Sequence, residues 1–204
     1  MALHALFPSL VYEGHLKAQR AALNRRLLSD LGGLELLDRL GRRWSRKNYR
    51  GGYTSYGSVT DLHRRFPAYE ELERLLQPHA KKYAAGLGWK LRGRKLLMTT
   101  CWVSRMPRST RHVMHNHPLC VMSGTYYVAV PRGTSSLRFE DPRLALMKAA
   151  PPRQKSSLIE SASAVSLPPS PGRFYFFPNW LRHEVPANPV AGERVSVSFN
   201  YEWA

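Results

Sequence analysis

The second half of the chain is a series of short β-forming segments, and this series constrains the fold more than any other feature. Segments rich in β-branched and aromatic residues alternate with turns that contain Pro, Gly and Ser. Several short strands at such spacing are typical of a β-sandwich or a jelly roll. The expected strands are Leu96–Met106, Met122–Pro131, Leu137–Glu140, Ala164–Leu167, Arg173–Phe177 and Arg194–Tyr201.

The first half has the periodicity of helices. Leucines recur at helical spacing up to Gly32-Gly33, and this glycine pair is expected to end the first helix. Pro78 falls inside the last helical pattern, where a proline predicts a kink or a break. The expected helices are His15–Leu31, Leu34–Leu40 and Pro67 to about Leu87.

A single domain is expected, because 204 residues can bury one sizeable core. Residues 1–95 are expected to be mainly helical support, and residues 96–204 to form an all-β core with these helices at its flank. Gly51–Gly57 is rich in glycine and tyrosine and is expected to form a loop that serves as a lid. Pro142–Pro171 is the least regular stretch and is expected to be an insertion or a flexible loop.

The formal net charge of +17 makes the surface attractive to anions. Nucleic acid is the usual partner of a protein with this charge. The basic residues are nevertheless spread along the chain, and the densest stretches, Arg42–Arg50 and Lys90–Lys95, lack a recognised nucleic-acid motif. We therefore expect an acidic peptide or protein as partner, with nucleic acid as the less favoured alternative.

Neither a membrane segment nor a secretory signal is expected. No apolar run reaches the roughly 18–20 residues that a membrane span requires, and Met1–Leu10 lacks a basic region followed by an apolar core. The two cysteines, Cys101 and Cys120, are too few for a disulfide framework. These features predict a cytoplasmic protein in which Cys101 is a small buried side chain.

Histidines are concentrated in one short block. Of the eight histidines, His112, His115 and His117 lie within six residues, and His183 follows a predicted strand. His115 and His117 are two positions apart, so on a strand they would point to the same face. With a distant third histidine they could bind a metal as non-haem iron(II) sites do, through three ligands on one face of an octahedron. The alternative is that they are ordinary surface histidines.

Arg194 begins the last predicted strand and shares a strand face with Ser196. A guanidinium binds a carboxylate through its planar fork, and a hydroxyl adds a further donor. Such a pair suits the far carboxylate of 2-oxoglutarate. An arginine on a half-buried strand more often forms a surface ion pair, but the β context and the preceding His183 favour the carboxylate.

Motifs recur in a definite order along the chain. Five blocks of the second half are His115–Pro118, Ser123–Val128, Phe139–Arg143, Phe177–Pro186 and Glu193–Asn200, and Leu6–Pro8 and Gly51–Ser55 precede them. This series resembles a family of 2OG-Fe(II) oxygenases from bacteria and phages and spans most of the chain. The resemblance implies a double-stranded β-helix (a cupin-like jelly roll) that uses Fe(II), 2-oxoglutarate and O2.

The resemblance also implies residue roles. It assigns His115, His117 and His183 as catalytic metal ligands. It assigns Arg194, with Ser196 beside it, to 2-oxoglutarate. Tyr126 and Tyr127 point to opposite faces of one strand, so only one of them can face the barrel interior. We place Tyr126 among the cofactor-binding residues, with core packing as the alternative.

Several alternatives stay open. The usual carboxylate ligand is absent from the His-x-His block, so either three histidines bind the metal or Asp141 replaces one of them. A cupin-type three-histidine dioxygenase would share these ligands but would not use 2-oxoglutarate. A basic module that binds nucleic acid or peptide would need no metal. The expected reaction is hydroxylation of a C–H bond in a peptidyl or amino-acid substrate.

Overall fold

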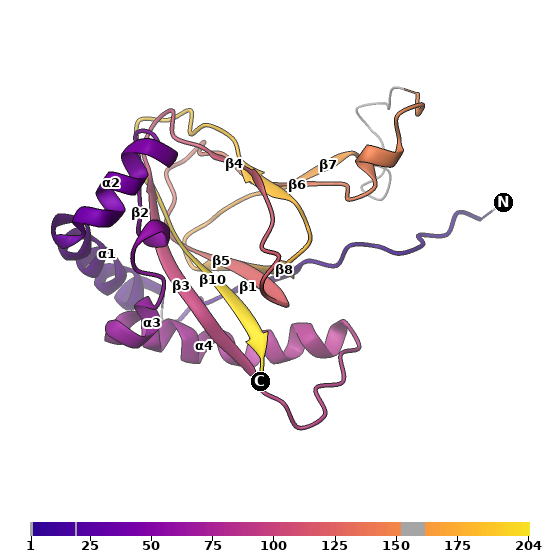
Figure 1. Cartoon of the computed structure of the whole chain (residues 1–204), viewed down its shortest axis with the longest axis horizontal. Coiled ribbons are helices and arrows are strands. Elements are labelled where there is room, and N and C mark those ends of the chain that lie inside the picture. The colour runs from indigo at the N-terminus through magenta and orange to yellow at the C-terminus, as the bar shows by residue number, and fades with distance from the viewer. Residues whose placement is uncertain (1, 19, 152–161) are drawn as a thin grey trace.

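The computed structural model describes residues 2–18, 20–151 and 162–204. Their strands form two antiparallel sheets, one of six strands and one of four (Figure 1). The larger sheet has the order β1-β8-β5-β10-β3-β2, and the smaller one has the order β4-β9-β6-β7. The strands are β1 (Tyr12–His15), β2 (Tyr53–Thr54), β3 (Leu96–Met106), β4 (His112–His115), β5 (Met122–Ala129), β6 (Leu137–Glu140), β7 (Ala164–Leu167), β8 (Arg173–Pro178), β9 (His183–Val185) and β10 (Arg194–Trp203).

From β3 onward the chain passes back and forth between the two sheets. β3, β5, β8 and β10 lie in the larger sheet, and β4, β6, β7 and β9 lie in the smaller one. Such an exchange of antiparallel strands between two sheets is an arrangement of the jelly-roll type. The expected β-rich core with flanking helices is therefore observed.

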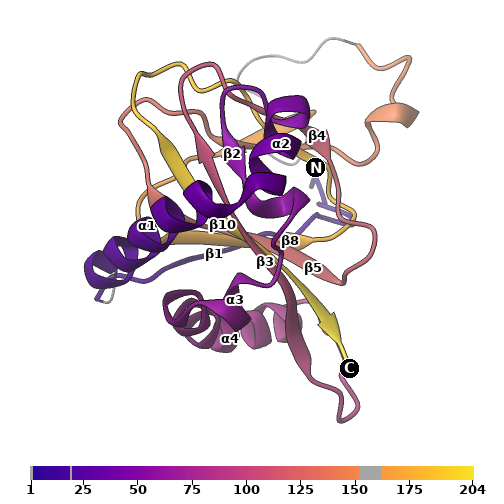
Figure 2. The same ribbon diagram turned by 60° about the vertical axis from the view of Figure 1, so that its left-hand side comes forward.

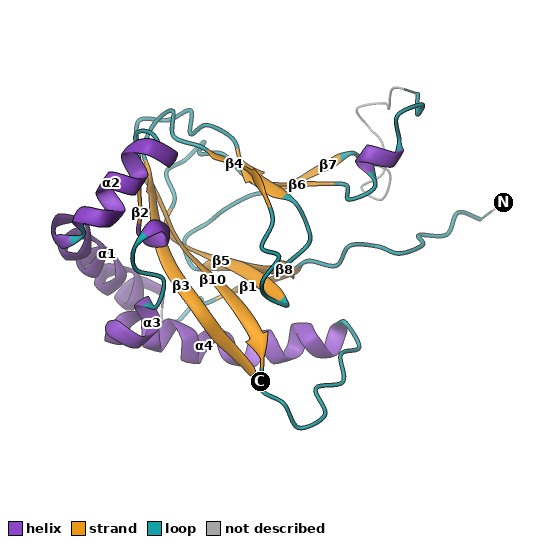
Figure 3. Ribbon diagram, viewed as in Figure 1, coloured by secondary structure: helices purple, strands orange, loops and turns teal. Residues whose placement is uncertain are grey.

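The helices cover the outer face of the larger sheet. Figure 3 shows α1 (Arg20–Leu37), α3 (Leu62–Arg65) and α4 (Pro67–Gly86) on one side of this sheet, with the smaller sheet on its other side. Alternate residues of β10, such as Val197, pack into the apolar cluster that the helices share. α2 (Arg39–Asn48) contacts β2 and the 3-10 turn η1 (Ser55–Gly57). No described helix is both long and apolar enough to span a bilayer.

A second cluster of buried side chains fills the space between the sheets. It includes Tyr127 on β5 and Phe177 on β8, which face away from the helices, and Phe139 on β6 and Val185 on β9, which face them from the smaller sheet. Beside this cluster the space widens into a pocket of about 300 Å³. The two sheets therefore hold a cavity between them.

The N-terminal elements differ from the expected ones. Strand β1 pairs with β8 where the first helix was expected to begin. Helix α1 then runs through Gly32 and Gly33, so the expectation that this pair ends the helix was wrong. An interior glycine costs a helix about 1 kcal/mol. Leu27, Leu31 and Leu34 pack into the core on both sides of the pair, and burial of such side chains outweighs that cost.

Two further helix predictions are corrected. The second helix is α2, which lies C-terminal to most of the expected Leu34–Leu40, because Asp38 caps its first turn by accepting a hydrogen bond from the Gly41 N–H at 2.8 Å. A kink or a break was expected at Pro78. α4 continues through this residue, so the helix is not broken there. The cap at Asp38 is a local signal, whereas the burial of Leu76 and Ala80 in the core holds α4 in place on both sides of Pro78.

The segment that was expected to be a lid is attached to the larger sheet. β2 pairs with the edge of β3, and the Ser104 hydroxyl donates to Oγ1 of Thr54 at 2.9 Å. The segment therefore forms a wall of the pocket. The expected irregular stretch Pro142–Pro171 contains η2 (Leu144–Leu146) and β7, and residues 152–161 of it lie outside the described residues.

Candidate metal and cosubstrate site

Three histidines meet in the pocket between the sheets. The ring centroids of His115 and His183 are 4.4 Å apart, and the ring of His117 lies 5.0 Å from that of His115 and 5.2 Å from that of His183. One ring nitrogen from each histidine lies within 4.8 Å of the other two. In the part of the chain that the structure describes, no carboxylate belongs to this group. Three converging imidazoles can hold one metal ion.

Strand register, rather than sequence proximity, produces the triad. His115 ends β4 and His183 begins β9, and the two residues are direct partners in the strand ladder. Partners of this kind project their side chains to the same face. His117 lies beyond β4, where its N–H donates to the Asn179 carbonyl at 2.9 Å. His115 and His117 therefore do not share a strand, although their side chains meet.

Backbone contacts orient two of the rings. Nδ1 of His115 donates to the Val113 carbonyl at 2.7 Å, and Nδ1 of His183 donates to the Leu181 carbonyl at 2.9 Å. A neutral imidazole that donates through Nδ1 has its lone pair on Nε2. Support of this kind is usual for metal-binding histidines.

Burial keeps all three histidines unprotonated. It lowers the pKa of His183 to about 3 and the pKa of His117 to about 4, and it lowers the pKa of His115. Metal ligands must be free of protons, because a proton and a metal compete for the same lone pair. At neutral pH the triad is therefore ready to bind a cation.

Arg194 is buried in the same pocket without an ion pair. Its side chain is 2% exposed, its Nη1 contacts the sulfur of Met106 at 3.4 Å, and its guanidinium lies 5.0 Å from the Tyr127 ring centroid. Its Nε has no hydrogen-bond partner. Among the described residues no carboxylate pairs with it. A buried charge is costly unless it is paired, so this arrangement suits an anionic ligand.

Two tyrosine hydroxyls complete the surroundings of Arg194. The hydroxyls of Tyr49 and Tyr127 are buried and have no hydrogen-bond partner in the described structure. Burial raises the pKa of both hydroxyls, and the charge of Arg194 acts on each in the opposite direction. Both are therefore protonated and can donate. A guanidinium and two free hydroxyls match a carboxylate, so these residues fit 2-oxoglutarate.

Ser196 and Tyr126, two further predicted site residues, are placed differently. Ser196 lines the pocket on the same strand face as Arg194. Tyr126 does not line it, because its hydroxyl donates to Oδ1 of Asn24 on α1 at 2.6 Å and its ring packs on the helical side. Tyr127, the strand partner of Ser196, faces Arg194 instead. The placement of Tyr126 beside the cosubstrate is thus corrected.

Most residues that line the pocket were not identified from the sequence, and Tyr49 and His112 are two examples. Tyr49 lies at the C-terminal end of α2, and its ring centroid is 4.4 Å from that of His112 on β4. His112 belonged to the histidine block but received no role. No local pattern could have linked Tyr49 to the block, because it comes from the segment expected to be helical support.

Asp141, the alternative ligand, has a different partner. Its carboxylate accepts hydrogen bonds from Nε of Arg143 at 3.0 Å and from Nη2 of the same side chain at 2.9 Å. It is not a member of the group that His115, His117 and His183 form. The geometry therefore favours the three-histidine set over the carboxylate version.

A family model described as "Putative 2OG-Fe(II) oxygenase" matches residues 100–200. This range contains the three histidines, Arg194 and Ser196. A comparison with curated protein sequences finds no significant match.

Solved structures with the same fold include several oxygenases. A Pseudomonas putida prolyl-4-hydroxylase is 14% identical with a TM-score of 0.62, and the match covers 95% of this chain and 92% of that one. HygX from Streptomyces hygroscopicus, solved with nickel, 2-oxoglutarate and hygromycin B, is 15% identical with a TM-score of 0.59. The match covers 95% of this chain and 82% of HygX. A Trichoplax adhaerens prolyl hydroxylase in complex with a hypoxia inducible factor peptide fragment is 14% identical with a TM-score of 0.60 and the same coverage. The chain spans 57% of a Burkholderia pseudomallei oxidoreductase of the 2OG-Fe(II) oxygenase family.

Proposed function

Because residues 100–200 of this chain belong to the 2OG-Fe(II) oxygenase family, we propose that it hydroxylates a C–H bond of a peptidyl or amino-acid substrate. Fe(II) and 2-oxoglutarate are the cofactor and cosubstrate of the family. In our proposal His115, His117 and His183 hold the iron, and Arg194 and Ser196 hold the far carboxylate of 2-oxoglutarate.

One observation carries this proposal: three unprotonated imidazoles and an unpaired buried guanidinium line the same pocket. A metal site alone would be compatible with many reactions. The combination with Arg194 calls for a ligand that has a carboxylate at some distance from its metal-binding end. 2-Oxoglutarate has this shape.

Each group of the chain has a definite task in the proposed reaction. Iron(II), 2-oxoglutarate and O2 together supply the oxidising power. The three histidines set the position of the metal, and the backbone carbonyls behind His115 and His183 keep their Nε2 atoms directed at it. Arg194, with the Tyr49 and Tyr127 hydroxyls, orients the cosubstrate and neutralises its charge. The apolar cluster between the sheets limits the access of water.

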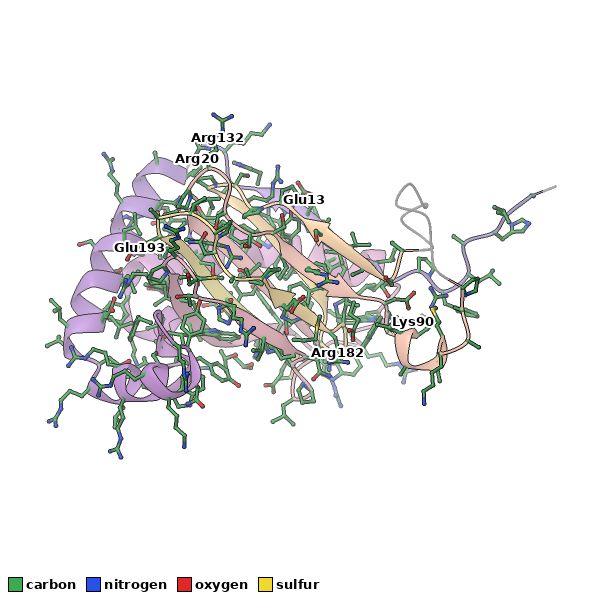
Figure 4. The ribbon with its side chains drawn as sticks, turned by 90° about the horizontal axis from the view of Figure 1, so that it is seen from above. Glu13, Arg20, Lys90, Arg132, Arg182 and Glu193 are labelled. Carbon is green, nitrogen blue, oxygen red and sulfur yellow. The ribbon has the colours of Figure 1, made fainter. Side chains whose placement is uncertain are left out.

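A peptide is the substrate class that we favour. The Trichoplax adhaerens relative was solved with a peptide fragment, whereas HygX was solved with hygromycin B, so the fold serves both classes. The net charge of +17 decides our choice, because a basic surface accelerates encounter with an acidic peptide. Basic side chains project from separate parts of the chain, among them Arg20, Lys90, Arg132 and Arg182 (Figure 4).

The finer description of the architecture follows from the same proposal. The strand order of the two sheets supports a double-stranded β-helix with the metal between the sheets, as in cupin-like folds. Tyr49, the residue that follows α2, lines the same pocket as Arg194 and Ser196 of β10, which supports one domain over residues 1–204. A cytoplasmic location stays a prediction.

The test uses Mn(II) as a redox-inert stand-in for iron. Calorimetry should show one Mn(II) per chain, and 2-oxoglutarate should bind to the Mn(II)-loaded protein. With Fe(II) and air, succinate should form from 2-oxoglutarate. His183→Ala should lose stoichiometric Mn(II) binding, because two imidazoles hold a metal far less tightly than three. His79→Ala, which changes a histidine outside the pocket, should keep it, and circular dichroism should show both variants folded.

The alternatives give different results. Metal binding without 2-oxoglutarate binding would favour the cupin-type dioxygenase. Loss of Mn(II) in Asp141→Ala, with retention in His117→Ala, would favour the carboxylate version of the site. No stoichiometric metal at all would leave a basic binding module.

A further inference from the structure

Helix α2 presents a row of basic side chains to solvent. They are exposed, and their spacing of three and four residues places them on one face of the helix. The helix contains no acidic residue. Within the described residues none of the row forms an ion pair. The row consists of Arg39, Arg43, Arg46 and Lys47, and the exposed Arg50 follows it.

The neighbouring face of α2 lines the pocket. Trp44 and Asn48, one turn apart, are both pocket residues. The indole of Trp44 lies 5.8 Å from the ring of Tyr56, measured between centroids, and Tyr56 lies 5.2 Å from Trp102. Trp102 in turn lies 5.9 Å from His117 of the metal triad. An aromatic wall therefore leads from the triad to the surface, where Tyr56 is 50% exposed.

The basic row and the aromatic wall are held in one fixed relation. Asp38 at the start of α2 accepts hydrogen bonds from Tyr53 Oη at 2.8 Å and Ser58 Oγ at 2.6 Å, which flank η1. The lack of a side chain at Gly57 leaves room for Trp44, because a Cβ at Gly57 would lie 2.2 Å from the indole Cγ. Figure 2 shows α2 beside β2, at the end of the molecule where β4 also lies. Trp44 and Lys47, three residues apart, are neighbours on the helix surface, so the basic row adjoins the opening of the pocket along this edge of α2.

We propose that this opening receives a peptide, with an acidic segment on α2 and an apolar target residue against the wall of Trp44, Tyr56 and Trp102. The inference rests on the proposed function and names the surface that selects its substrate. The row extends about 12 Å along the helix, at about 1.5 Å per residue. An extended peptide advances about 3.3 Å per residue, so about four residues cover the row.

The chemistry of the opening fits this occupant. Carboxylates would pair with a row that has no partners of its own, and a cationic segment would be repelled. An apolar side chain would lose water against three aromatic rings, one of which, Trp102, lies next to His117. Arg111 and Asn116 also line the pocket and can donate hydrogen bonds to peptide carbonyls.

The first experiment measures binding of a fluorescein-labelled peptide of Glu-Glu-Pro repeats by anisotropy, at about 50 mM salt, where surface charges act over more than 10 Å. The Mn(II)- and 2-oxoglutarate-loaded protein should bind it. The variant Arg43→Gln/Arg46→Gln/Lys47→Gln should bind about tenfold more weakly or worse. The matched control Lys82→Gln/Lys90→Gln/Lys95→Gln removes the same charge near the C-terminal end of α4 and beyond it, and should change affinity less than about twofold.

The outcomes are distinct. Equal weakening in both triple variants would mean that net charge alone attracts the peptide, which overturns the proposal. Tighter, α2-dependent binding of an oligothymidylate probe would assign the surface to nucleic acid and overturn it too. Failure of Mn(II) or 2-oxoglutarate binding in the wild-type protein would contradict the proposed function instead. The peptide titrations are therefore repeated on the metal-free protein, where binding that the α2 variant weakens and the control variant does not would still support the docking surface.

A second experiment tests the aromatic wall. Replacing proline by serine in the probe should weaken binding to the wild-type protein. In Tyr56→Ala the same replacement should matter much less, because the apolar contact is already lost. Trp203→Ala, which removes an exposed aromatic residue far along β10, should behave as the wild type does. Equal sensitivity to the replacement in Tyr56→Ala and the wild type would show that the target residue does not contact the wall.

Discussion

Arg194 is the residue whose surroundings are least explained without a ligand. Its guanidinium is buried beside Met106 and Tyr127, neither of which can neutralise it. A charge-assisted pair with a carboxylate contributes about 1.5–3 kcal/mol. Arg194→Gln should therefore weaken 2-oxoglutarate binding by about one to two orders of magnitude. Calorimetry on the Mn(II)-loaded protein measures this change.

The same measurement separates a binding role from a folding role. Mn(II) affinity should be unchanged in Arg194→Gln, because Arg194 is not a metal ligand. Arg138→Gln, which changes an exposed arginine on β6, should alter neither affinity. If Arg194→Gln bound 2-oxoglutarate as tightly as the wild type, Arg194 would not bind 2-oxoglutarate, and its guanidinium would have to pair with a different anion.

At the scale of elements, α2 reaches the site from the helical half, beside β2 and η1. It supplies Trp44 and ends next to Tyr49, and Asp38 fixes its start. Asp38 accepts three hydrogen bonds, from the Gly41 N–H, the Tyr53 hydroxyl and the Ser58 hydroxyl. Its side chain thereby ties helix, strand β2 and turn η1 together.

Removal of this carboxylate should be costly for stability. Asp38→Ala should lower the free energy of unfolding by about 2–3 kcal/mol, because it removes a helix cap and leaves the buried Tyr53 hydroxyl without its acceptor. Urea unfolding followed by tryptophan fluorescence measures the change. Glu70→Ala, at an exposed position in the first turn of α4, should cost about 1 kcal/mol or less. A similar loss in both variants would show that the Asp38 network does not act as one unit.

At the scale of the whole molecule, the buried histidines make stability depend on pH. Burial lowers the pKa of His117 to about 4 and of His183 to about 3, and it lowers the pKa values of His63 and His112. In the unfolded chain these groups accept protons near pH 6.5. Below that pH the unfolded state binds more protons than the folded state, so stability falls as the pH falls.

The metal-free protein should therefore lose stability between pH 6.5 and about 4. Each buried histidine contributes up to about 1.4 kcal/mol per pH unit in this window. Urea midpoints measured from pH 7 to pH 5 should decline, and His117→Gln/His183→Gln should show a shallower decline. His4→Gln, at an exposed position, should follow the wild type. A slope that is identical in all three proteins would contradict this explanation.

The sequence alone was enough for the class of fold and for the family. Strand segments carry their own signal, because β-branched and aromatic residues alternate within them, and each of the six predicted segments corresponds to a strand. The order of the motifs identified the 2OG-Fe(II) oxygenase family, which the family model confirms. His115, His117, His183, Arg194 and Ser196 could be named as candidates because each lies within one of these motifs.

Which residues from separate segments meet in the site was decided by the tertiary structure alone. The register of β4 on β9 pairs His115 with His183, and the register of β10 on β5 turns Tyr127 rather than Tyr126 toward Arg194. Shifting a strand by one residue reverses every side chain, and no local pattern specifies that choice. Trp44 and Tyr49 reach the pocket only through the packing of α2 against β2 and η1. Propensity is a property of a segment, whereas a site depends on the free energy of packing segments against one another.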